Sequence, residues 1–510
     1  MKKILGIELG STRIKSVLID ESASVIAQGS HEWENKLENG FWTYSLEDVW
    51  TGLQSSFADL CKNYGAPIES LDSIGISAMM HGYLAFDKDD KLLVPFRTWR
   101  NTTTAQAADE LTVALDFNMP QRWSGSHFYQ AVLNKEEHVK DVTFLTTLAG
   151  YVHWMLTGEK VLGIGDAAGM VPVKDNDYDG DKIEIYNSLL KKNGVDKDLR
   201  ALLPRAVSAG GDAGCLTEKG ALLLDPTGKL KAGCPLCPPE GDAGTGMVAT
   251  NAVKVRTGNV SAGTSAFAMV VLEKPLSKVN TSIDVVATPS GAPVAMVHAN
   301  NFTSEINAWA SLFNEVIELA GGSIKKGQLF DKLYEISAQS DSDVGGLVGY
   351  NFLSGEPIVG MESGIPLVAR KPSGKLTLAN FMQMQLYSAL GAMSIGMEIL
   401  AEEKVQIDDM CGHGGFFKTP FIGANAMSAA LGAPITTMKN AGEGGAWGVA
   451  VLALYRICND TTLECFLDNL FASTEKETVS ASSEEKAKFA AFMKDYKAGL
   501  AVEKKATEVL

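Results

Sequence analysis

The feature that most constrains this chain is a pair of glycine–hydroxyl segments, one in each half of the sequence. The first is Gly10-Ser11-Thr12 and the second is Gly263-Thr264-Ser265, and each follows an apolar run typical of a β-strand. Glycine lets backbone N–H groups come close to a phosphate, and the small hydroxyl residues add donors without bulk. A single hairpin of this kind is an ordinary turn. Two of them favour a duplicated fold that grips one polyphosphate from both sides.

The hydrophobic pattern around each segment supports this duplication. In the first half the pattern predicts strands at 3–9, 16–19, 25–28 and 73–77 and an amphipathic helix over 45–62. Near residue 250 the pattern restarts, with strands expected at 254–260, 265–272 and 292–299. Helices are then expected at 303–320, 326–338, 377–404, 420–432 and 442–455, with a charged helix after residue 480. Residues 104–205 are expected to be mainly helical and connective, with a loop at 175–181. The mixture predicts an α/β protein with two domains, 1–250 and 251–510.

Composition narrows the possible partners. The net charge of −16 argues against a nucleic-acid partner, which requires a basic surface. The apolar run at the start breaks at Glu8, too early for a signal peptide, and the run from Trp447 to Tyr455 is too short to cross a bilayer. Seven scattered cysteines indicate a reducing compartment, so we expect a cytoplasmic protein without a membrane partner.

The cysteines at 234 and 237 form a lone CxxC motif. A structural zinc site usually needs a second pair of ligands nearby, and the sequence shows none. We therefore interpret Cys234 and Cys237 as small apolar residues beside a proline-rich turn, with a metal or redox role as the alternative.

Asp242 is the strongest candidate for a catalytic group. The sequence contains neither GxxxxGK[ST] nor GxGxxG, so neither a P-loop nor a nicotinamide site is indicated. Asp242 lies between two glycines, at the expected start of a helix whose N-terminus would favour the ionised carboxylate. An ionised aspartate beside a substrate hydroxyl is what phosphoryl transfer to an alcohol requires. The alternative is a simple helix cap.

Three further segments could bind ligands. Met80-His81-Gly82 ends a predicted strand and could hold a sugar hydroxyl, and Trp99-Arg100-Asn101 has a similar position. The turn with Gly414 and Gly415, followed by Lys418, could let a flat base lie on the backbone. In each case a purely structural role is the alternative. The small residues at 442–448 we interpret as a helix-packing surface.

Taken together, these motifs resemble the FGGY carbohydrate kinases over nearly the whole chain. The opening is similar to the family's D-x-G-T-T/S-x-x-K, which ends here at Lys15. The other matching segments are SAMMHG, LTGE with DAAG, GDAG, SAGTS, FLSGE, Gly414-Gly415 and GGAWG.

The resemblance implies two RNase H-like domains of the actin, Hsp70 and sugar kinase type, with the active cleft between them. It implies ATP, Mg²⁺ and a sugar or polyol substrate, with a homodimer as a possible assembly. The domain 1–250 would be on the sugar side and 251–510 on the nucleotide side. By position, Asp242 becomes the general base, and Met80, His81, Trp99 and Asp242 the sugar contacts. The ATP contacts become Gly10, Ser11, Thr12, Lys15, Gly263, Thr264, Gly414, Gly415 and Lys418. Glu8 and Asp242 would hold Mg²⁺, partly through water.

The chain departs from the family pattern at three places. Glu8 replaces the usual Asp, Ala243 replaces an Asn found in many pentulose kinases, and Trp99-Arg100-Asn101-Thr102 differs from the corresponding substrate motifs. The expected reaction is phosphorylation of a ketopentose at its terminal hydroxyl, with xylulose and L-ribulose as the leading substrates. Glycerol, erythritol and a deoxyketose are alternatives. Other classes left open are a non-catalytic actin- or Hsp70-like ATPase and a sugar sensor that lost catalysis at Glu8.

Overall fold

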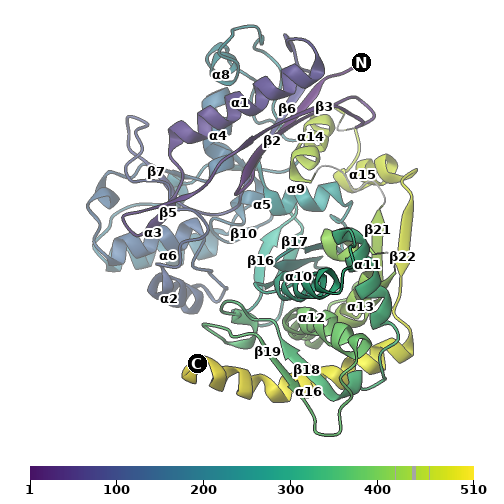
Figure 1. The fold of residues 1–510 in the computed structure, drawn as a ribbon. Helices are drawn as coiled ribbons and strands as arrows, with labels where there is room; N and C mark the ends of the chain where they lie inside the picture. Colours follow the sequence, from purple (N-terminus) through teal and green to yellow (C-terminus); the bar gives the residue numbers. More distant parts are fainter. Residues whose placement is uncertain (420, 439–443, 459) are drawn as a thin grey trace. The chain divides into compact units, whose positions relative to one another are not determined.

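The chain contains two larger β-sheets and several two-stranded sheets, and Figure 1 shows its fold. The computed structural model describes residues 1–419, 421–438, 444–458 and 460–510. The chain divides into two units by its internal contacts. The first unit contains Met1–Lys254, Lys278–Val294 and the described part of Ala441–Ser473, and the second contains Val255–Ser277, the described part of Ala295–Asn440 and Thr474–Leu510. Both units are therefore built from separate stretches of the sequence.

The sheet of the first unit has the strand order β13-β6-β1-β2-β3. Strands β1, β2 and β3 form an antiparallel meander, whereas β6 runs parallel to β1 and β13 runs parallel to β6. These strands are β1 (Ile4–Leu9), β2 (Arg13–Ile19), β3 (Val25–Glu32), β6 (Ser73–Ala78) and β13 (Glu240–Gly241).

Two helices pack closely on this sheet because glycines replace side chains at the contacts. Helix α1 (Leu46–Tyr64) begins at the cap Ser45, whose side chain accepts the N–H of Asp48, and a Cβ on Gly29 of β3 would lie 2.2 Å from the backbone nitrogen of Leu60. Helix α14 (Gly445–Arg456) packs on β1, where a Cβ on Gly6 would lie 2.1 Å from the carbonyl oxygen of Ala446. The predicted packing role of the segment 442–448 is confirmed for its described part; residues 442 and 443 lie outside the described residues.

The rest of the first unit consists of shorter elements. Its helices are α2 (Ala105–Leu115), α3 (Ser124–Leu133), α4 (Leu148–Thr157), α5 (Ile164–Ala167), α6 (Gly180–Lys192), α7 (Leu199–Leu202), α8 (Glu218–Leu224), α9 (Asp242–Ala249) and α15 (Leu463–Phe471). Its short strands are β4 (Lys36–Glu38), β5 (Phe41–Thr43), β7 (Leu84–Phe86), β8 (Phe144–Thr146), β9 (Val161–Gly163), β10 (Val173–Lys174), β11 (Asp177–Tyr178), β12 (Arg205–Val207) and β16 (Asp284–Ala287).

In the second unit the strand order runs β17-β15-β14-β20-β21-β22. An antiparallel hairpin, β14 with β15, again lies next to a parallel strand, β20. This arrangement repeats that of β2, β1 and β6, as the restart of the sequence pattern predicts. The strands are β14 (Thr257–Ala262), β15 (Ala266–Val271), β17 (Pro293–Ala299), β20 (Asp409–His413), β21 (Ile435–Met438) and β22 (Lys476–Val479).

Helix α12 (Leu378–Glu402) forms the interior of the second unit and is buried along most of its length. A Cβ on its Gly391 would lie 2.4 Å from the ring of Tyr496, so the glycine admits the aromatic side chain of α16. The other elements are α10 (Ser304–Leu319), α11 (Lys326–Ser337), α13 (Ile422–Leu431), α16 (Ser483–Val509), β18 (Leu347–Tyr350) and β19 (Leu367–Arg370).

The strands and helices predicted from periodicity are confirmed over the described residues, with small shifts at their ends; residue 420, where one predicted helix begins, lies outside the described residues, as 442 and 443 do. The loop expected at 175–181 is wrong. Strands β10 and β11 form a hairpin there, joined by Asp175 and Asn176 with φ of 52° and 63°, and α6 begins at Gly180. Asp and Asn tolerate this left-handed conformation, which a two-residue hairpin turn requires.

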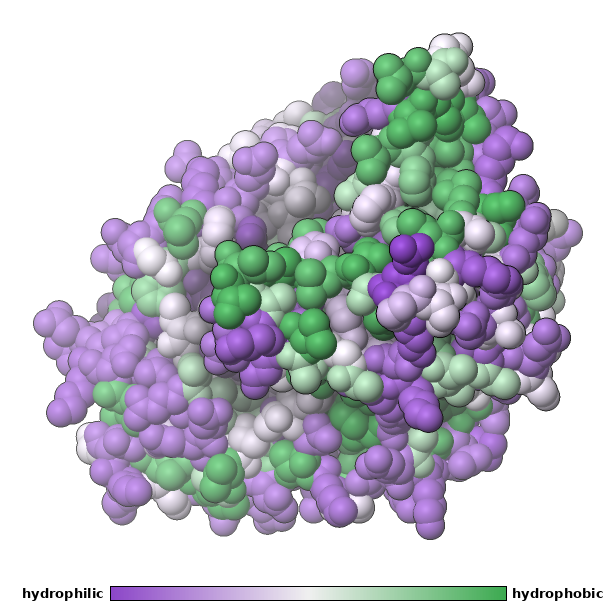
Figure 2. Space-filling view, turned by 60° about the horizontal axis from the view of Figure 1, so that its bottom comes forward, coloured by the Kyte–Doolittle hydropathy of each residue, from purple (hydrophilic) through white to green (hydrophobic). Residues whose placement is uncertain are grey.

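Exposed apolar residues occur in separate patches among hydrophilic side chains, as the face shown in Figure 2 illustrates. Within the part of the chain that the structure describes, no helix is both long and apolar enough to span a bilayer. Cys234 and Cys237 are buried free thiols, and burial raises the pKa of Cys234 to about 12. This environment fits their interpretation as small apolar residues.

Candidate active site

Three parallel strands of the first sheet end side by side, and the candidate residues lie at these ends. In the strand register, Glu8 of β1 and Glu240 of β13 both pair with Ser77 of β6, which lies between them. The chain passes from β13 directly into α9, so Asp242 is the first residue of that helix. The sheet thus brings the opening motif and the GDAG motif to one edge.

Asp242 is held by backbone donors. Its Oδ1 accepts the N–H of Ala243 at 2.9 Å and the N–H of Met80 at 3.3 Å. The residue is accessible to solvent, but the protein atoms crowded around its carboxyl group raise its pKa to about 6. The expectation that the helix start favours the ionised form is therefore wrong. The backbone N–H groups lower the pKa of Asp242, but the loss of solvent around its carboxyl group raises it more. A carboxylate with this pKa is ionised at pH 7 and can still accept a proton.

Glu8 faces a similar environment. Burial is the main reason that its pKa rises to about 7; Lys15, its cross-strand partner, lowers the pKa and Asp242 raises it. A Cβ on Gly445 would lie 2.3 Å from Oε1 of Glu8, so the longer acid fills the space at the start of α14. Glu8 and Asp242 are close enough to repel each other, and a divalent cation would relieve that repulsion.

The two carboxylates of Glu8 and Asp242 fit Mg²⁺ better than a metal ion whose ligands all come from the protein. Among the residues that the structure describes, no group of three or more His, Cys, Asp or Glu side chains is arranged to hold a metal ion. Mg²⁺ usually takes one or two carboxylates and completes its shell with water and substrate phosphates. Glu8 and Asp242 match that pattern.

Aromatic side chains hold the first hairpin in place. The indole N–H of Trp33 donates to the Gly10 carbonyl at 2.7 Å, and the hydroxyl of Tyr44 donates to the Ser11 carbonyl at 2.5 Å. The Trp33 and Tyr44 rings stack with their centroids 4.1 Å apart. The indole of Trp99, which is 38% exposed, donates to the Ser11 hydroxyl at 3.3 Å. Trp99 thus lies beside the hairpin.

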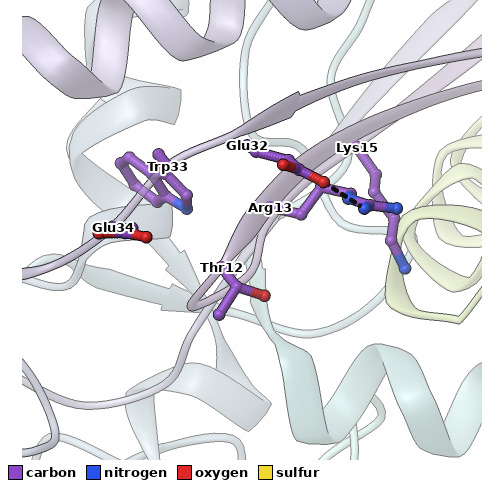
Figure 3. Close-up of a pocket in the computed structure, with 6 residues that line it drawn as sticks. All are labelled: Thr12, Arg13, Lys15, Glu32, Trp33 and Glu34. Atoms are coloured by element: carbon purple, nitrogen blue, oxygen red, sulfur yellow. Dashed lines mark hydrogen bonds and ion pairs between the residues drawn. The ribbon is translucent and has the colours of Figure 1, made fainter.

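A cavity opens next to this hairpin (Figure 3). Two of its side chains, Arg13 and Lys15, are cationic. Arg13 pairs with Glu32 at 2.7 Å, and the Lys15 side chain acts electrostatically on Glu8. The residues lining the cavity are Thr12, Arg13, Lys15, Glu32, Trp33 and Glu34. Lys15 and Thr12, two predicted ATP contacts, therefore share one polar cavity.

His81 is neutral and has a defined tautomer. Its Nδ1 lies 3.1 Å from the Gly169 carbonyl, which only accepts, so Nδ1 carries the proton and Nε2 is an acceptor. Burial, followed by the charge of Arg122, lowers the pKa of His81 to about 3. The ring stacks on Trp123 with centroids 6.0 Å apart. An acceptor of this kind suits a sugar hydroxyl.

The neighbours of His81 and Trp99 serve different purposes. The Met80 side chain packs against β13, where a Cβ on Gly241 would lie 2.1 Å from its Cγ. Asn101 accepts the N–H of Trp42 at 2.8 Å and donates to the Trp42 carbonyl at 2.9 Å, a structural role. The structure thus brings Met80 into contact with Asp242 and places His81 next in the chain.

Two buried carboxyl groups beside Asp242 were missed from the sequence. Glu240 accepts the N–H of Gly165 at 3.2 Å and that of Asp166 at 2.9 Å. Asp166 accepts from the Thr147 hydroxyl at 2.6 Å, and its Oδ1 has no hydrogen-bond partner among the described residues. Burial raises the pKa of Asp166 to about 7 and that of Glu240 to about 8. Both acids lie in motifs rich in small residues, but nothing in the sequence indicates that they are buried.

In the second unit, the hairpin between β14 and β15 is also pinned. The Gly263 N–H donates to the Ser265 carbonyl at 3.0 Å, which closes the turn. The Thr303 hydroxyl donates to the Gly263 carbonyl at 2.6 Å, and the Phe302 N–H donates to the Thr264 carbonyl at 2.9 Å. The segment that follows β17 therefore supports this loop.

The glycine turn after β20 lies against the same hairpin. A Cβ on Gly414, which has φ of 110°, would lie 2.3 Å from the Ala262 carbonyl oxygen, so only glycine fits there. A Cβ on Gly415 would meet no atom within 4 Å, and Lys418 is exposed. Gly414, a predicted ATP contact, and the hairpin that carries Gly263 and Thr264 are thus neighbours within one unit.

A second network missed from the sequence supports the loop at 300–303. The amide oxygen of Asn301 accepts the N–H groups of Leu353 and Ser354 at 2.9 and 3.0 Å, and its amide nitrogen donates to Glu356 at 3.2 Å. Burial raises the pKa of Glu356 to about 7. The FLSGE motif therefore has a structural task here, because it holds the loop that supports the hairpin.

Comparison with known proteins gives the family. Residues 3–227 match the N-terminal domain of the FGGY family of carbohydrate kinases, and residues 258–457 match its C-terminal domain. The chain belongs to the FGGY family of carbohydrate kinases. It is a sugar kinase, an enzyme that uses a sugar and ATP as substrates.

Similar FGGY proteins share its length and fold. A xylulose kinase of Haemophilus influenzae is 21% identical over 473 residues, which cover 86% of this chain and 91% of that protein. The structure of a xylulose kinase from Lactobacillus acidophilus has a TM-score of 0.79 at 17% identity and covers 99% of this chain and 100% of its own. A gluconate kinase from the same species has a TM-score of 0.81 at 17% identity, with 99% of both chains covered. The mixed α/β two-domain fold is that of the FGGY sugar kinases.

Proposed function

We propose that this FGGY kinase transfers the γ-phosphoryl group of ATP to the terminal hydroxyl of a ketopentose, either xylulose or L-ribulose. The observation that carries the proposal is the position of Asp242 at the first turn of α9, beside Met80 and within electrostatic reach of Glu8. The similarity to xylulose kinases supports a ketopentose substrate.

In this proposal Asp242 acts as the general base. The substrate hydroxyl donates its hydrogen bond to the Asp242 carboxylate, and the proton moves to that carboxylate as the oxygen attacks the γ-phosphorus. Met80 and Ala243 orient the carboxylate through their backbone N–H groups. His81 accepts a hydrogen bond from a second sugar hydroxyl at Nε2. Positioning of this kind supplies most of the catalysis when the transition state is loose.

The remaining site residues are proposed to bind ATP and the metal. In the first unit Gly10, Ser11, Thr12 and Lys15 bind phosphate, and Trp99 borders the sugar. In the second unit the proposed ATP contacts are Gly263, Thr264, Gly414, Gly415 and Lys418. Glu8 and Asp242 would hold Mg²⁺, which neutralises phosphate charge when it is bound. We assign 1–250 to the sugar side and 251–510 to the nucleotide side, except that Lys278–Val294, which belongs to the first unit, lies on the sugar side.

A substrate screen tests this proposal. ADP release would be measured with ketopentoses, ketohexoses and polyols, at saturating ATP and Mg²⁺. Xylulose or L-ribulose should give the highest kcat/KM. A higher kcat/KM with a polyol or a ketohexose would contradict the proposed substrate while leaving the kinase assignment intact.

A further inference from the structure

One cationic side chain flanks His81 in the first unit. The Gly82 N–H donates to the Arg122 carbonyl at 3.0 Å, and the next residue, Trp123, stacks on the His81 ring. The Arg122 guanidinium also acts electrostatically on His81. A ligand held at His81 would therefore meet the field of this guanidinium.

The charge of Arg122 is already compensated by Asp284. The guanidinium donates to Oδ2 of Asp284, and the two side chains are 25% and 11% exposed. Asn118 donates to Oδ1 of Asp284 at 2.9 Å and to the Ile283 carbonyl at 3.0 Å. Each oxygen of the Asp284 carboxylate thus has its own donor, and the ion pair is held in place from both sides.

Four carboxylic acids lie at the nearby strand ends, and Lys15 is the cross-strand partner of one of them, Glu8. Glu8, Asp166, Glu240 and Asp242 all lie at or just beyond the ends of β1, β6 and β13, or contact residues there. A bound carboxylate would approach these acids, and the cation that acts on His81, Arg122, is already paired with Asp284. Burying a charge without a partner is costly, whereas a neutral hydroxyl group loses little in the same place.

We propose that the Arg122–Asp284 pair is a specificity element that excludes sugar acids and admits neutral sugars. This inference rests on the proposed function and on His81 as a sugar contact. An unpaired arginine would bind the carboxylate of an aldonate with two parallel hydrogen bonds. Asp284 occupies the guanidinium, so the substrate class is a neutral polyhydroxy compound. On this proposal, the similarity to the gluconate kinase of Lactobacillus acidophilus is a similarity of fold and does not extend to the substrate.

Matched substrate pairs test the proposal on the wild-type enzyme. Xylitol against xylonate, and sorbitol against gluconate, differ only by a hydroxymethyl group in place of a carboxylate. Each compound would be titrated as a competitive inhibitor of phosphorylation of the preferred ketopentose. We expect each aldonate to bind at least about tenfold more weakly than its alditol. Equal or tighter binding of the aldonates would overturn the proposal.

A charge-neutral variant then tests the role of the pair itself. Asp284→Asn keeps the side-chain shape and one acceptor, for Arg122, but removes the compensating charge and the acceptor for Asn118. The aldonate-to-alditol affinity ratio should rise about tenfold, the scale of one added charge-assisted hydrogen bond. Asp212→Asn is the matched control, because exposed Asp212 pairs with Arg456 at 2.9 Å in the same unit. It should leave the ratio unchanged.

Two outcomes refute the assignment of this role. A folded Asp284→Asn protein with an unchanged ratio would refute it, and so would an equal change in the Asp212→Asn control. If Asp284→Asn does not fold, the wild-type comparison still tests whether the site excludes sugar acids. If no sugar or polyol in the substrate screen causes ADP release, the proposed function fails. Calorimetric binding of each alditol and aldonate to the wild-type protein then still tests the substrate class.

Discussion

Replacing His81 by asparagine gives a sharp test of the sugar side of the site. His81 has φ of 69°, a conformation that asparagine tolerates better than alanine does. The asparagine side-chain nitrogen lies at the same number of bonds from Cβ as Nδ1, so it can donate to the Gly169 carbonyl as His81 does at 3.1 Å. The variant lacks the acceptor at Nε2. It therefore removes one proposed contact to the sugar and keeps the local fold.

The expected effect follows from the loss of one hydrogen bond. Such a bond contributes about 1–1.5 kcal/mol, which corresponds to roughly a tenfold change in affinity. The KM for the preferred sugar should therefore rise about tenfold in His81→Asn, while the KM for ATP changes by less than about twofold. Steady-state ADP release with each substrate varied in turn measures both constants.

The control for this experiment is His31→Asn, which replaces a histidine on β3. It should change neither KM. An unchanged sugar KM in His81→Asn, or an ATP KM that rises as much as the sugar KM, would refute the assignment of His81 to the sugar.

Three further predictions follow from the same geometry. Glu8→Gln should reduce Mg²⁺-dependent turnover sharply. Glu8→Asp should retain much of it, because a water between the carboxylate and the metal can compensate for a side chain that is shorter by one methylene. Equal losses of turnover in the two variants would argue against Glu8 as a metal-binding carboxylate. The value of kcat/KM should begin to fall near pH 7 as Glu8 takes up a proton, and should fall more steeply below about pH 6, because only ionised Asp242 accepts the proton. A flat profile down to pH 5 would argue against Asp242 as base. Gly6→Ala should lower the Tm, because the new Cβ would lie 2.1 Å from the Ala446 carbonyl oxygen and overpacking costs about 1–3 kcal/mol. Gly180→Ala should leave the Tm unchanged, because the space around Gly180 is open. Equal Tm values for the two glycine variants would contradict the packing argument.

The sequence predicts the local elements of this fold well because their signals are local. The helical spacing of Leu46, Trp50, Leu53, Phe57 and Leu60 predicts α1 without any tertiary information. The two glycine–hydroxyl turns likewise mark the hairpins of both units. A short two-residue hairpin such as β10–β11 has no periodicity, so only its Asp-Asn turn could have indicated it.

The buried polar groups of the site could not be predicted in the same way. Asp166 and Glu240 have the sequence surroundings of ordinary loop acids, and their burial depends on β13 pairing with β6, which lies far away in the sequence. The pairing of Arg122 with Asp284 depends on another such long-range contact. The upward pKa shift of Asp242 has the same origin, since the protein atoms that the fold crowds around its carboxyl group outweigh the local backbone donors.

The central claim is that Asp242 accepts the proton from the sugar hydroxyl, and Asp242→Asn tests it most directly. Asparagine keeps an oxygen that can accept the N–H groups of Met80 and Ala243, so the backbone around it should persist. Sugar-dependent ADP release by the variant and the wild type would be compared at pH 7, with ATP affinity measured by calorimetry. We expect kcat to fall about 10²–10⁴-fold with ATP affinity nearly unchanged. A variant that retains more than about half of the wild-type kcat would contradict the account.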